Sequence, residues 1–384
     1  MIVKNKFNGK KLEQARKIRN LTLQEVAEAT GISHQSISKY EKNKAIPSRE
    51  MIHLLARLLK FETTFFYSEE VEDRFFENSF IYRSKACVAK KYKDQTENQL
   101  GMIHLLVSNI KKRVNLPKFD VNLIRQSSSS ADFMPTSDDE IETLAGSIRK
   151  KFGLSDGPIG NLTNLCEKLG VHIFYLNMNH QGIDACSVLI DNTPYIVLNR
   201  DITSAVRIRF NIAHELGHIM LHSKYTKKVL NKKQHSKRME YEANRFASAL
   251  LLPESGIAKD LTALGLDYLV MLKKHWMVSV QAIIYRAEQL ELFTPEYCLY
   301  LRQQISRKKW RQKEPFDDEI TIEKPRLFSH AIHYLNEKLN ISISQISFES
   351  GVLADEIREL CNEGTQLNTI NHHQPQVSYL KRVK

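Results

Sequence analysis

Long apolar runs are missing from this 384-residue sequence. No stretch of about 18 apolar residues occurs, so we expect no transmembrane helix and no membrane partner. The first residues, MIVKNKFNGKK, lack the apolar segment that a secretory signal requires. We therefore expect a cytoplasmic chain.

Cysteine is also scarce, with five residues that form no CxxC pair. An odd number of scattered cysteines argues against a disulfide framework and against a cysteine-based zinc site. The 42% hydrophobic and 26% charged residues are ordinary for a globular protein, and the length suits two or three domains. The 56 Lys and Arg exceed the 44 Asp and Glu. This excess would attract phosphate groups, but it is spread along the chain and is weak evidence for nucleic-acid binding.

A zinc-binding pattern, HELGH, is present at residues 214–218. The run before it has apolar residues at helical spacing and no proline. A helix places His214 and His218 on one face, where both imidazoles can bind one tetrahedral zinc ion. Glu215 lies beside the first ligand and can act as the general base, and Gly217 lets a second backbone approach closely. The alternative is two solvated histidines on a surface helix.

A second helical segment, residues 239–253, favours the catalytic interpretation, because a catalytic zinc site needs a third protein ligand. In its sequence MEYEANRFASALLLP, Glu240 and Asn244 lie four positions apart on one face. Glu240 can therefore bind zinc, and Asn244 can hydrogen-bond a ligating histidine. Glu242 points elsewhere on the helix, and we expect it to be a solvated surface charge.

The motifs HELGHIMLH and EYEANRFASALLLP resemble those of the ImmA/IrrE family of bacterial metallopeptidase domains. The resemblance implies a zincin-like, gluzincin-type domain that binds one zinc ion per chain. By position, His214, His218 and Glu240 would be the metal ligands and Glu215 the catalytic base. His222 also matches the family pattern. It either contacts a ligand or the substrate, or it is a helix-end histidine favoured by the helix dipole.

Residues 9–67 have the spacing of a helix-turn-helix domain, in which Gly31 suits the tight turn and Ile32 its buried anchor. The spacing resembles the XRE/Cro type of phage-repressor domain. This resemblance implies a five-helix lambda-repressor-like fold that binds a double-stranded DNA operator as a homodimer. The alternative is a helical protein-docking module. The expected DNA-contacting residues are at the start and on the outward face of the third helix: Ser33, His34, Gln35, Ser36, Ser38 and Lys39.

Three β-rich segments, VHIFYL, ACSVLI and YIVLN, precede the HELGH helix. With a turn at Asp191 and Asn192, they predict a small antiparallel sheet. An exposed edge of the hairpin at residues 185–199 could bind an extended peptide by strand addition. A plain core hairpin is the alternative.

We therefore predict an α+β, mainly helical chain of five parts. These are an XRE/Cro-type domain at 1–68, a helical connector or linker at 69–136, a zinc metallopeptidase core at 137–256, a helical C-terminal extension at 257–370 and a disordered tail at 371–384.

Two functions remain open. The chain is either a DNA-binding regulator whose zinc endopeptidase, active or latent, cleaves itself or a partner repressor after a stress or mobile-element signal, or a regulator or antitoxin whose zinc domain is a non-proteolytic sensor or structural module. An intact Glu215 favours the first, because a structural zinc needs no adjacent base.

Overall fold

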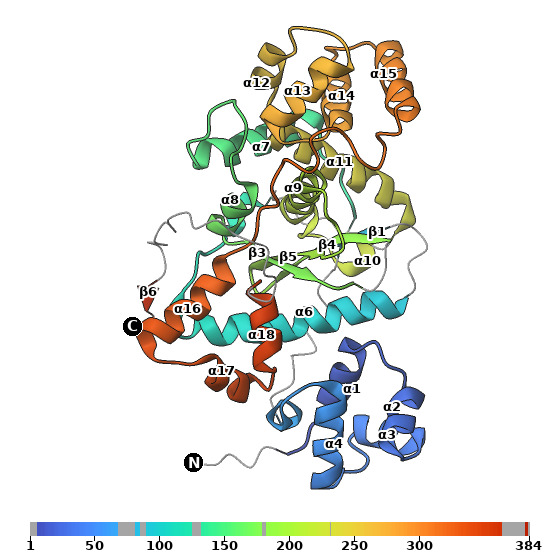
Figure 1. The fold of residues 1–384 in the computed structure, drawn as a ribbon, viewed down its shortest axis with the longest axis vertical. Helices are drawn as coiled ribbons and strands as arrows, with labels where there is room; N and C mark the ends of the chain where they lie inside the picture. Colours follow the sequence, from blue (N-terminus) through green and yellow to red (C-terminus); the bar gives the residue numbers. More distant parts are fainter. Residues whose placement is uncertain are drawn as a thin grey trace.

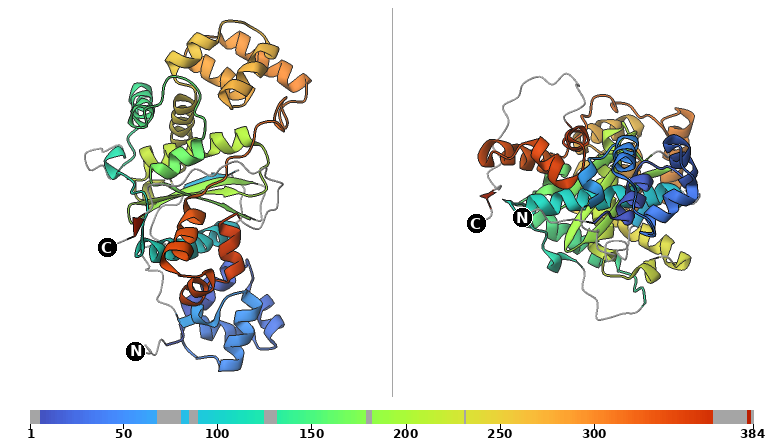
Figure 2. Two further views of the ribbon diagram at one scale, coloured as in Figure 1. Left: turned by 60° about the vertical axis from the view of Figure 1, so that its left-hand side comes forward. Right: turned by 90° about the horizontal axis from the view of Figure 1, so that it is seen from below.

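The structure, a computed structural model, describes residues 6–67, 81–84, 90–124, 132–178, 182–230, 232–362 and 381–382. Its layers succeed one another along the long axis of the molecule (Figures 1 and 2). The N-terminal domain lies at one end, followed by the long helix α6 (Lys90–Lys111), a four-stranded sheet, the helix α9 (Ala205–His222) and a group of helices at the far end. The prediction of a mainly helical α+β fold is confirmed. Within the described ranges, no helix is both long and apolar enough to cross a membrane.

The N-terminal domain has four α-helices and a 3₁₀-helix in the fifth helical position. They are α1 (Gly9–Ile18), α2 (Leu23–Thr30), α3 (His34–Glu41), α4 (Arg49–Leu59) and η1 (Thr63–Tyr67). Thr22, Ser33 and Ser48 cap α2, α3 and α4, since each side chain accepts a hydrogen bond from the backbone N–H three residues later. These caps fix where each helix begins, so α2, the turn and α3 take the helix-turn-helix arrangement.

The helix α6 joins this domain to the rest of the molecule. Gln14 of α1 donates a hydrogen bond to the carbonyl of Asn98 at 3.3 Å, and Gln95 of α6 donates to the carbonyl of Ile18 at 2.9 Å. The side chains of Gln14, Gln95 and Asn98 are all buried. The connector predicted at 69–136 therefore includes, in α6, a helix that packs between the N-terminal domain and the sheet.

The C-terminal helices fall into two groups (Figure 1). The first group covers the far end of the molecule: α12 (Glu254–Asp260), α13 (Leu266–Trp276), α14 (Val280–Gln289) and α15 (Pro295–Arg307). The second returns along the sheet toward the N-terminal domain: α16 (Leu327–Leu339), α17 (Ile343–Ser350) and α18 (Ala354–Leu360).

The returning helices contact the N-terminal domain directly. Glu356 of α18 accepts a hydrogen bond from Arg19 at 2.7 Å, and Arg19 also donates to the carbonyl of Leu59 at the end of α4. The Glu62 N–H donates to the carbonyl of Gly351 at 2.9 Å. Two segments far apart in the sequence, α6 and residues 343–360, thus hold the N-terminal domain.

The sheet has the strand order β1-β4-β5-β3, and its strands are β1 (Ile81–Ser84), β3 (His172–Leu176), β4 (Ile183–Ile190) and β5 (Thr193–Asn199). Asp191 and Asn192 both have positive φ, at 47° and 59°, as a two-residue type I′ hairpin turn requires. The strand β3 runs parallel to β5, so the prediction of a wholly antiparallel sheet is wrong. Alternating apolar residues predict a strand but not its direction.

A two-stranded ladder pairs β2 (Val114–Asn115) with β6 (Lys381–Arg382). Apart from this pair, the predicted disordered tail at 371–384 lies outside the described residues. The remaining helices are η2 (Val121–Leu123), α7 (Asp138–Lys151), α8 (Leu162–Lys168), α10 (Lys227–Leu230) and α11 (Lys233–Leu251). The helix α8 contacts β3 and α9, whereas α7 and α10 pack on α11.

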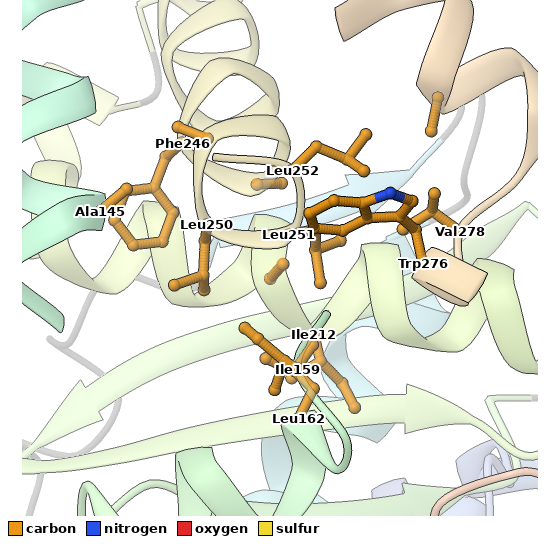
Figure 3. Close-up of a cluster of buried hydrophobic side chains, with 14 of the residues drawn as sticks. Ala145, Ile159, Leu162, Ile212, Phe246, Leu250, Leu251, Leu252, Trp276 and Val278 are labelled. Atoms are coloured by element: carbon orange, nitrogen blue, oxygen red, sulfur yellow. The ribbon is translucent and has the colours of Figure 1, made fainter. Parts of the chain in front are cut away.

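The two faces of the sheet belong to two different hydrophobic cores. Ala185 and Leu198 face the core that contains α9, whereas Cys186 and Val197 face the core that contains α6. Alternation along a strand explains this division, because successive side chains point to opposite faces. On the α9 side, α11 packs through a cluster that includes Phe246, Leu250 and Trp276 (Figure 3). This core fixes α9 and α11 side by side.

A buried histidine makes the fold sensitive to acid. The ring of His172 stacks on Tyr195 with centroids 5.4 Å apart, and burial lowers the pKa of His172 to about 3. The unfolded chain has a histidine pKa of about 6.5. Between these values the unfolded state binds one more proton, so folding stability falls as the pH falls, by up to about 1.4 kcal/mol per pH unit.

We therefore expect the His172→Phe variant to unfold at a lower pH than the wild type. Circular dichroism during an acid titration measures the midpoint. His53, which is exposed on α4, provides the matched control, because the His53→Phe variant should keep the wild-type midpoint. An equal shift in both variants would contradict the argument.

Candidate metal centre and DNA-binding surface

The candidate metal centre lies between α9 and α11. Ser204 caps α9 by accepting a hydrogen bond from the N–H of Arg207, which sets the helical register of the HELGH residues. A Cβ added at Gly217 would lie 3.2 Å from backbone atoms of Ala243 in α11. Since a larger residue there would push the helices apart, Gly217 permits the close approach on which the site depends.

The side chains of His214, His218 and Glu240 converge on one point. The two Nε2 atoms are 3.0 Å apart, and each lies 3.5 Å from an oxygen of Glu240. In a tetrahedral zinc site with bonds of about 2.0–2.1 Å, ligand atoms are separated by about 3.3 Å. Among the described residues, this is the group of histidine, cysteine and acidic side chains arranged to hold a metal ion. The donor set therefore fits zinc in type and in spacing.

Hydrogen bonds determine which ring nitrogens carry protons. His214 Nδ1 lies 2.9 Å from the Asn244 side-chain oxygen and must donate to it. His222 Nε2 lies 3.0 Å from Glu242 and donates to that carboxylate. In a neutral His222 the Nδ1 atom then accepts, so His218 Nδ1, 2.9 Å away, is the donor. Both metal-facing Nε2 atoms of neutral His214 and His218 consequently present lone pairs to the same point.

The chain of hydrogen bonds behind His218 ends on Glu242. Burial lowers the pKa of His222 to about 4, which keeps its ring neutral. Although burial opposes ionisation of Glu242, hydrogen bonds from His222, the Thr136 N–H and Arg238 lower the pKa of its carboxyl. Glu242 is 0% exposed. The expectation of a solvated charge at this position is therefore wrong: the residue lies under the metal centre rather than on the surface.

Glu215 is also fully buried, beside the first histidine of the cluster. Its carboxylate accepts a hydrogen bond of 2.5 Å from the Ser187 hydroxyl of β4. Ser187 orients the carboxylate of the candidate general base. No sequence pattern indicates this contact, because Ser187 belongs to no motif and meets Glu215 only when the sheet packs on α9.

A cleft of about 1000 Å³ lies beside Asn244, although neither the three candidate ligands nor Glu215 line it. Asn244, which holds His214, forms part of its wall, and the cleft extends past Asp184 of β4 and the N-terminal turns of α9 to Tyr285 of α14. Asn211 also lines it, and its buried side-chain nitrogen has no hydrogen-bond partner within the described part of the chain. The cleft thus offers a polar wall and a donor for a ligand next to the metal centre.

The expected DNA-contacting residues all lie at the start or on the surface of α3. Ser33 serves as the cap, and its hydroxyl is 3.0 Å from that of Ser36, so both are engaged locally. Ser38 is half-buried, whereas His34, Gln35 and Lys39 are exposed. The exposed three are the ones whose side chains can reach base edges or phosphates.

A helix-turn-helix domain joined to a domain with a His-His-Glu cluster has the architecture of a DNA-binding protein with a peptidase-like domain. Comparison with protein families supports each half: residues 12–66 match the helix-turn-helix family, and residues 166–288 match the IrrE N-terminal-like domain of peptidase family M78. The chain therefore carries an XRE-type helix-turn-helix domain and an ImmA/IrrE-like domain, as both sequence resemblances predicted. The comparison with curated proteins found no match.

Proposed function

We propose that this chain is a transcriptional regulator whose ImmA/IrrE-like domain is an endopeptidase with one zinc ion per chain, which cleaves itself or a partner repressor after a stress or mobile-element signal. One observation carries the zinc site, and the intact Glu215 beside it extends that site to catalysis. Two histidine nitrogens that present lone pairs face each other at 3.0 Å with a carboxylate beside them, an arrangement that repels unless a cation lies between them.

The residues around the site suit peptide hydrolysis. His214, His218 and Glu240 would hold zinc, which supplies polarisation of a peptide carbonyl and increases the acidity of a water molecule. Glu215, held by Ser187, would accept the proton of the attacking water and pass it to the leaving amine as the C–N bond breaks.

Replacement of the general base tests this proposal. We expect Glu215→Gln to slow cleavage by about 10²–10⁴-fold and to abolish derepression of a reporter gene, while zinc content and operator affinity stay at wild-type levels. Intact-mass spectrometry of the chain and of a co-expressed repressor measures the cleavage.

The competing function is a regulator or antitoxin whose zinc domain cleaves nothing, and the complete burial of Glu215 is the observation that favours it. Under this alternative, Glu215→Gln derepresses the reporter as the wild type does, and neither protein shows a cleavage product.

DNA binding would place two copies of α3 in successive major grooves of a two-fold operator. On an operator selected from random DNA, Gln35→Ala should weaken specific binding by about 1–3 kcal/mol, the value of a good base contact. Lys39→Ala should instead weaken binding to all sequences and reduce the salt dependence. Gln24, which contacts Glu28 on α2, serves as the control, and Gln24→Ala should bind like the wild type. Anisotropy titrations at several salt concentrations distinguish these results.

A further inference from the structure

The chain itself covers the outer edge of β4. The strand β1 pairs with β4 in antiparallel register, with Ile81 opposite Ser187, Tyr82 opposite Cys186 and Arg83 opposite Ala185. The other strand of the hairpin, β5, pairs with β3 on the side away from β4. Both outer edges of the hairpin are therefore paired with another strand of the described sheet, and the predicted exposed edge is covered.

The strand β1 comes from a segment that precedes the matched ImmA/IrrE-like residues in the chain. Strands β3, β4 and β5 lie within the matched residues 166–288, whereas β1 lies outside both matched segments. It has four residues, against eight in β4, and the register shifts between Arg83 and Ser84. A short strand with an irregular register holds fewer ladder hydrogen bonds than the core strands do.

The covered edge is the one beside the candidate general base. Ile81 is the partner of Ser187, whose hydroxyl holds Glu215. At the other end of the ladder, β4 reaches Asp184 in the wall of the cleft. The backbone of β1 therefore runs from the neighbourhood of Glu215 toward the cleft, the course that an extended peptide would take.

We infer that the outer edge of β4 is the peptide-binding site of the ImmA/IrrE-like domain and that β1 is its resident occupant, which any other extended peptide must displace. The site binds by strand addition, in which main-chain hydrogen bonds supply the affinity. This inference deepens the proposed function, since it assigns the position of the peptide on which the peptidase acts. A tethered strand competes at an effective concentration on the order of millimolar, so the free edge is masked from peptides in trans.

Weakening β1 should uncover the site. The probe is a fluorescein-labelled copy of residues 79–86, Ser-Phe-Ile-Tyr-Arg-Ser-Lys-Ala, and every protein carries Glu215→Gln so that the probe stays intact. Along a strand, alternate N–H groups point to opposite sides, so Tyr82→Pro/Arg83→Pro removes the donors of both sides and must break the ladder with β4. The matched control, Tyr82→Ala/Arg83→Ala, keeps both donors.

We expect the proline variant to bind the probe at least about tenfold more tightly than the wild type and the alanine variant do. A probe with N-methyl groups at the corresponding two amides should lose this binding. Equal affinity for all three proteins, or no binding to any of them, overturns the inference. In the proline variant, hydrogen exchange should show lost protection only at the amides of residues 183–187 that face β1, because the alternate amides remain bonded to β5.

A covalent lock tests the same edge in the opposite direction. Because Tyr82 is the direct partner of the native Cys186, Tyr82→Cys places two cysteines within the range that a disulfide can bridge. We use Cys87→Ser as the background, to remove a competing thiol, and verify the bond by mass spectrometry. When Tyr82→Cys is combined with Arg83→Pro/Ser84→Pro, which again removes the donors of two consecutive residues, reduced protein should bind the probe and oxidised protein should not. Binding that is indifferent to oxidation overturns the inference.

These binding measurements need no catalysis and no reporter gene. If the peptidase cleaves nothing but the proline variant gains the probe, the proposed enzyme fails and the peptide-binding edge stands. If Glu215 proves essential for cleavage but the affinities are all equal, the enzyme stands and β1 is a structural strand.

Discussion

Purified Glu240→Ala protein should contain no stoichiometric zinc, whereas the wild-type chain should bind about one ion. Removing this carboxylate leaves only His214 and His218, and two ligands do not hold a catalytic zinc ion. Elemental mass spectrometry after gel filtration measures the content.

The comparison with Glu242 makes this test specific. Glu242→Gln keeps the size of the side chain but removes the charge that orients His222, and through it His218. Changes to such supporting groups weaken metal binding by about 10–100-fold. The Glu242→Gln protein should therefore still fill with zinc when the metal is in excess and lose it to a chelator sooner than the wild type does. The ligand assignment is wrong if Glu240→Ala retains zinc and Glu242→Gln cannot be filled.

Gly351→Ala should detach α17 and α18 from the DNA-binding domain. Gly351 has a φ of +74°, and an added Cβ would lie 2.4 Å from the backbone of Phe65. Left-handed backbone conformation costs an L-residue about 1–2 kcal/mol, and overpacking adds about 1–3 kcal/mol. The hydrogen-exchange rate of the Glu62 amide, which donates a hydrogen bond to the Gly351 carbonyl, should therefore rise strongly.

The same substitution in α7 provides the control. Gly146 is exposed within that helix, and an added Cβ would meet nothing within 4 Å. Because alanine favours a helix interior over glycine by up to about 1 kcal/mol, Gly146→Ala should stabilise the chain slightly and leave the exchange of Glu62 unchanged. A Gly351→Ala protein with wild-type protection at Glu62 would show that this contact does not hold the two parts together.

The sequence predicted the features that depend on local spacing. His214 and His218 share a helical face because they are four residues apart. Glu240 faces them because it lies on the same side of its helix as the apolar residues Ala243 and Ala247, which pack toward the HELGH helix. Ser33, expected at the start of the third helix, caps it through an equally local hydrogen bond.

The features that sequence analysis missed depend on contacts between distant segments. Glu242 reads as a surface charge on a helical wheel, yet it is buried because His222 and the Thr136 N–H meet it there. Ser187 finds Glu215 only through the packing of the sheet on α9. The direction of β3 and the pairing of β1 with β4 follow from how the chain returns to the sheet, which the alternation of side chains does not encode.

The DNA-binding domain is held at two places, by α6 and by residues 343–360, and both follow β1 along the chain. A cut within β1 would therefore leave the two fragments attached to each other. The nicked molecule would be a bimolecular complex whose separation depends on dilution and on its dissociation rate. The time between the cut and the loss of the DNA-binding domain would then depend on the dissociation rate that these contacts determine, not on the rate of cleavage.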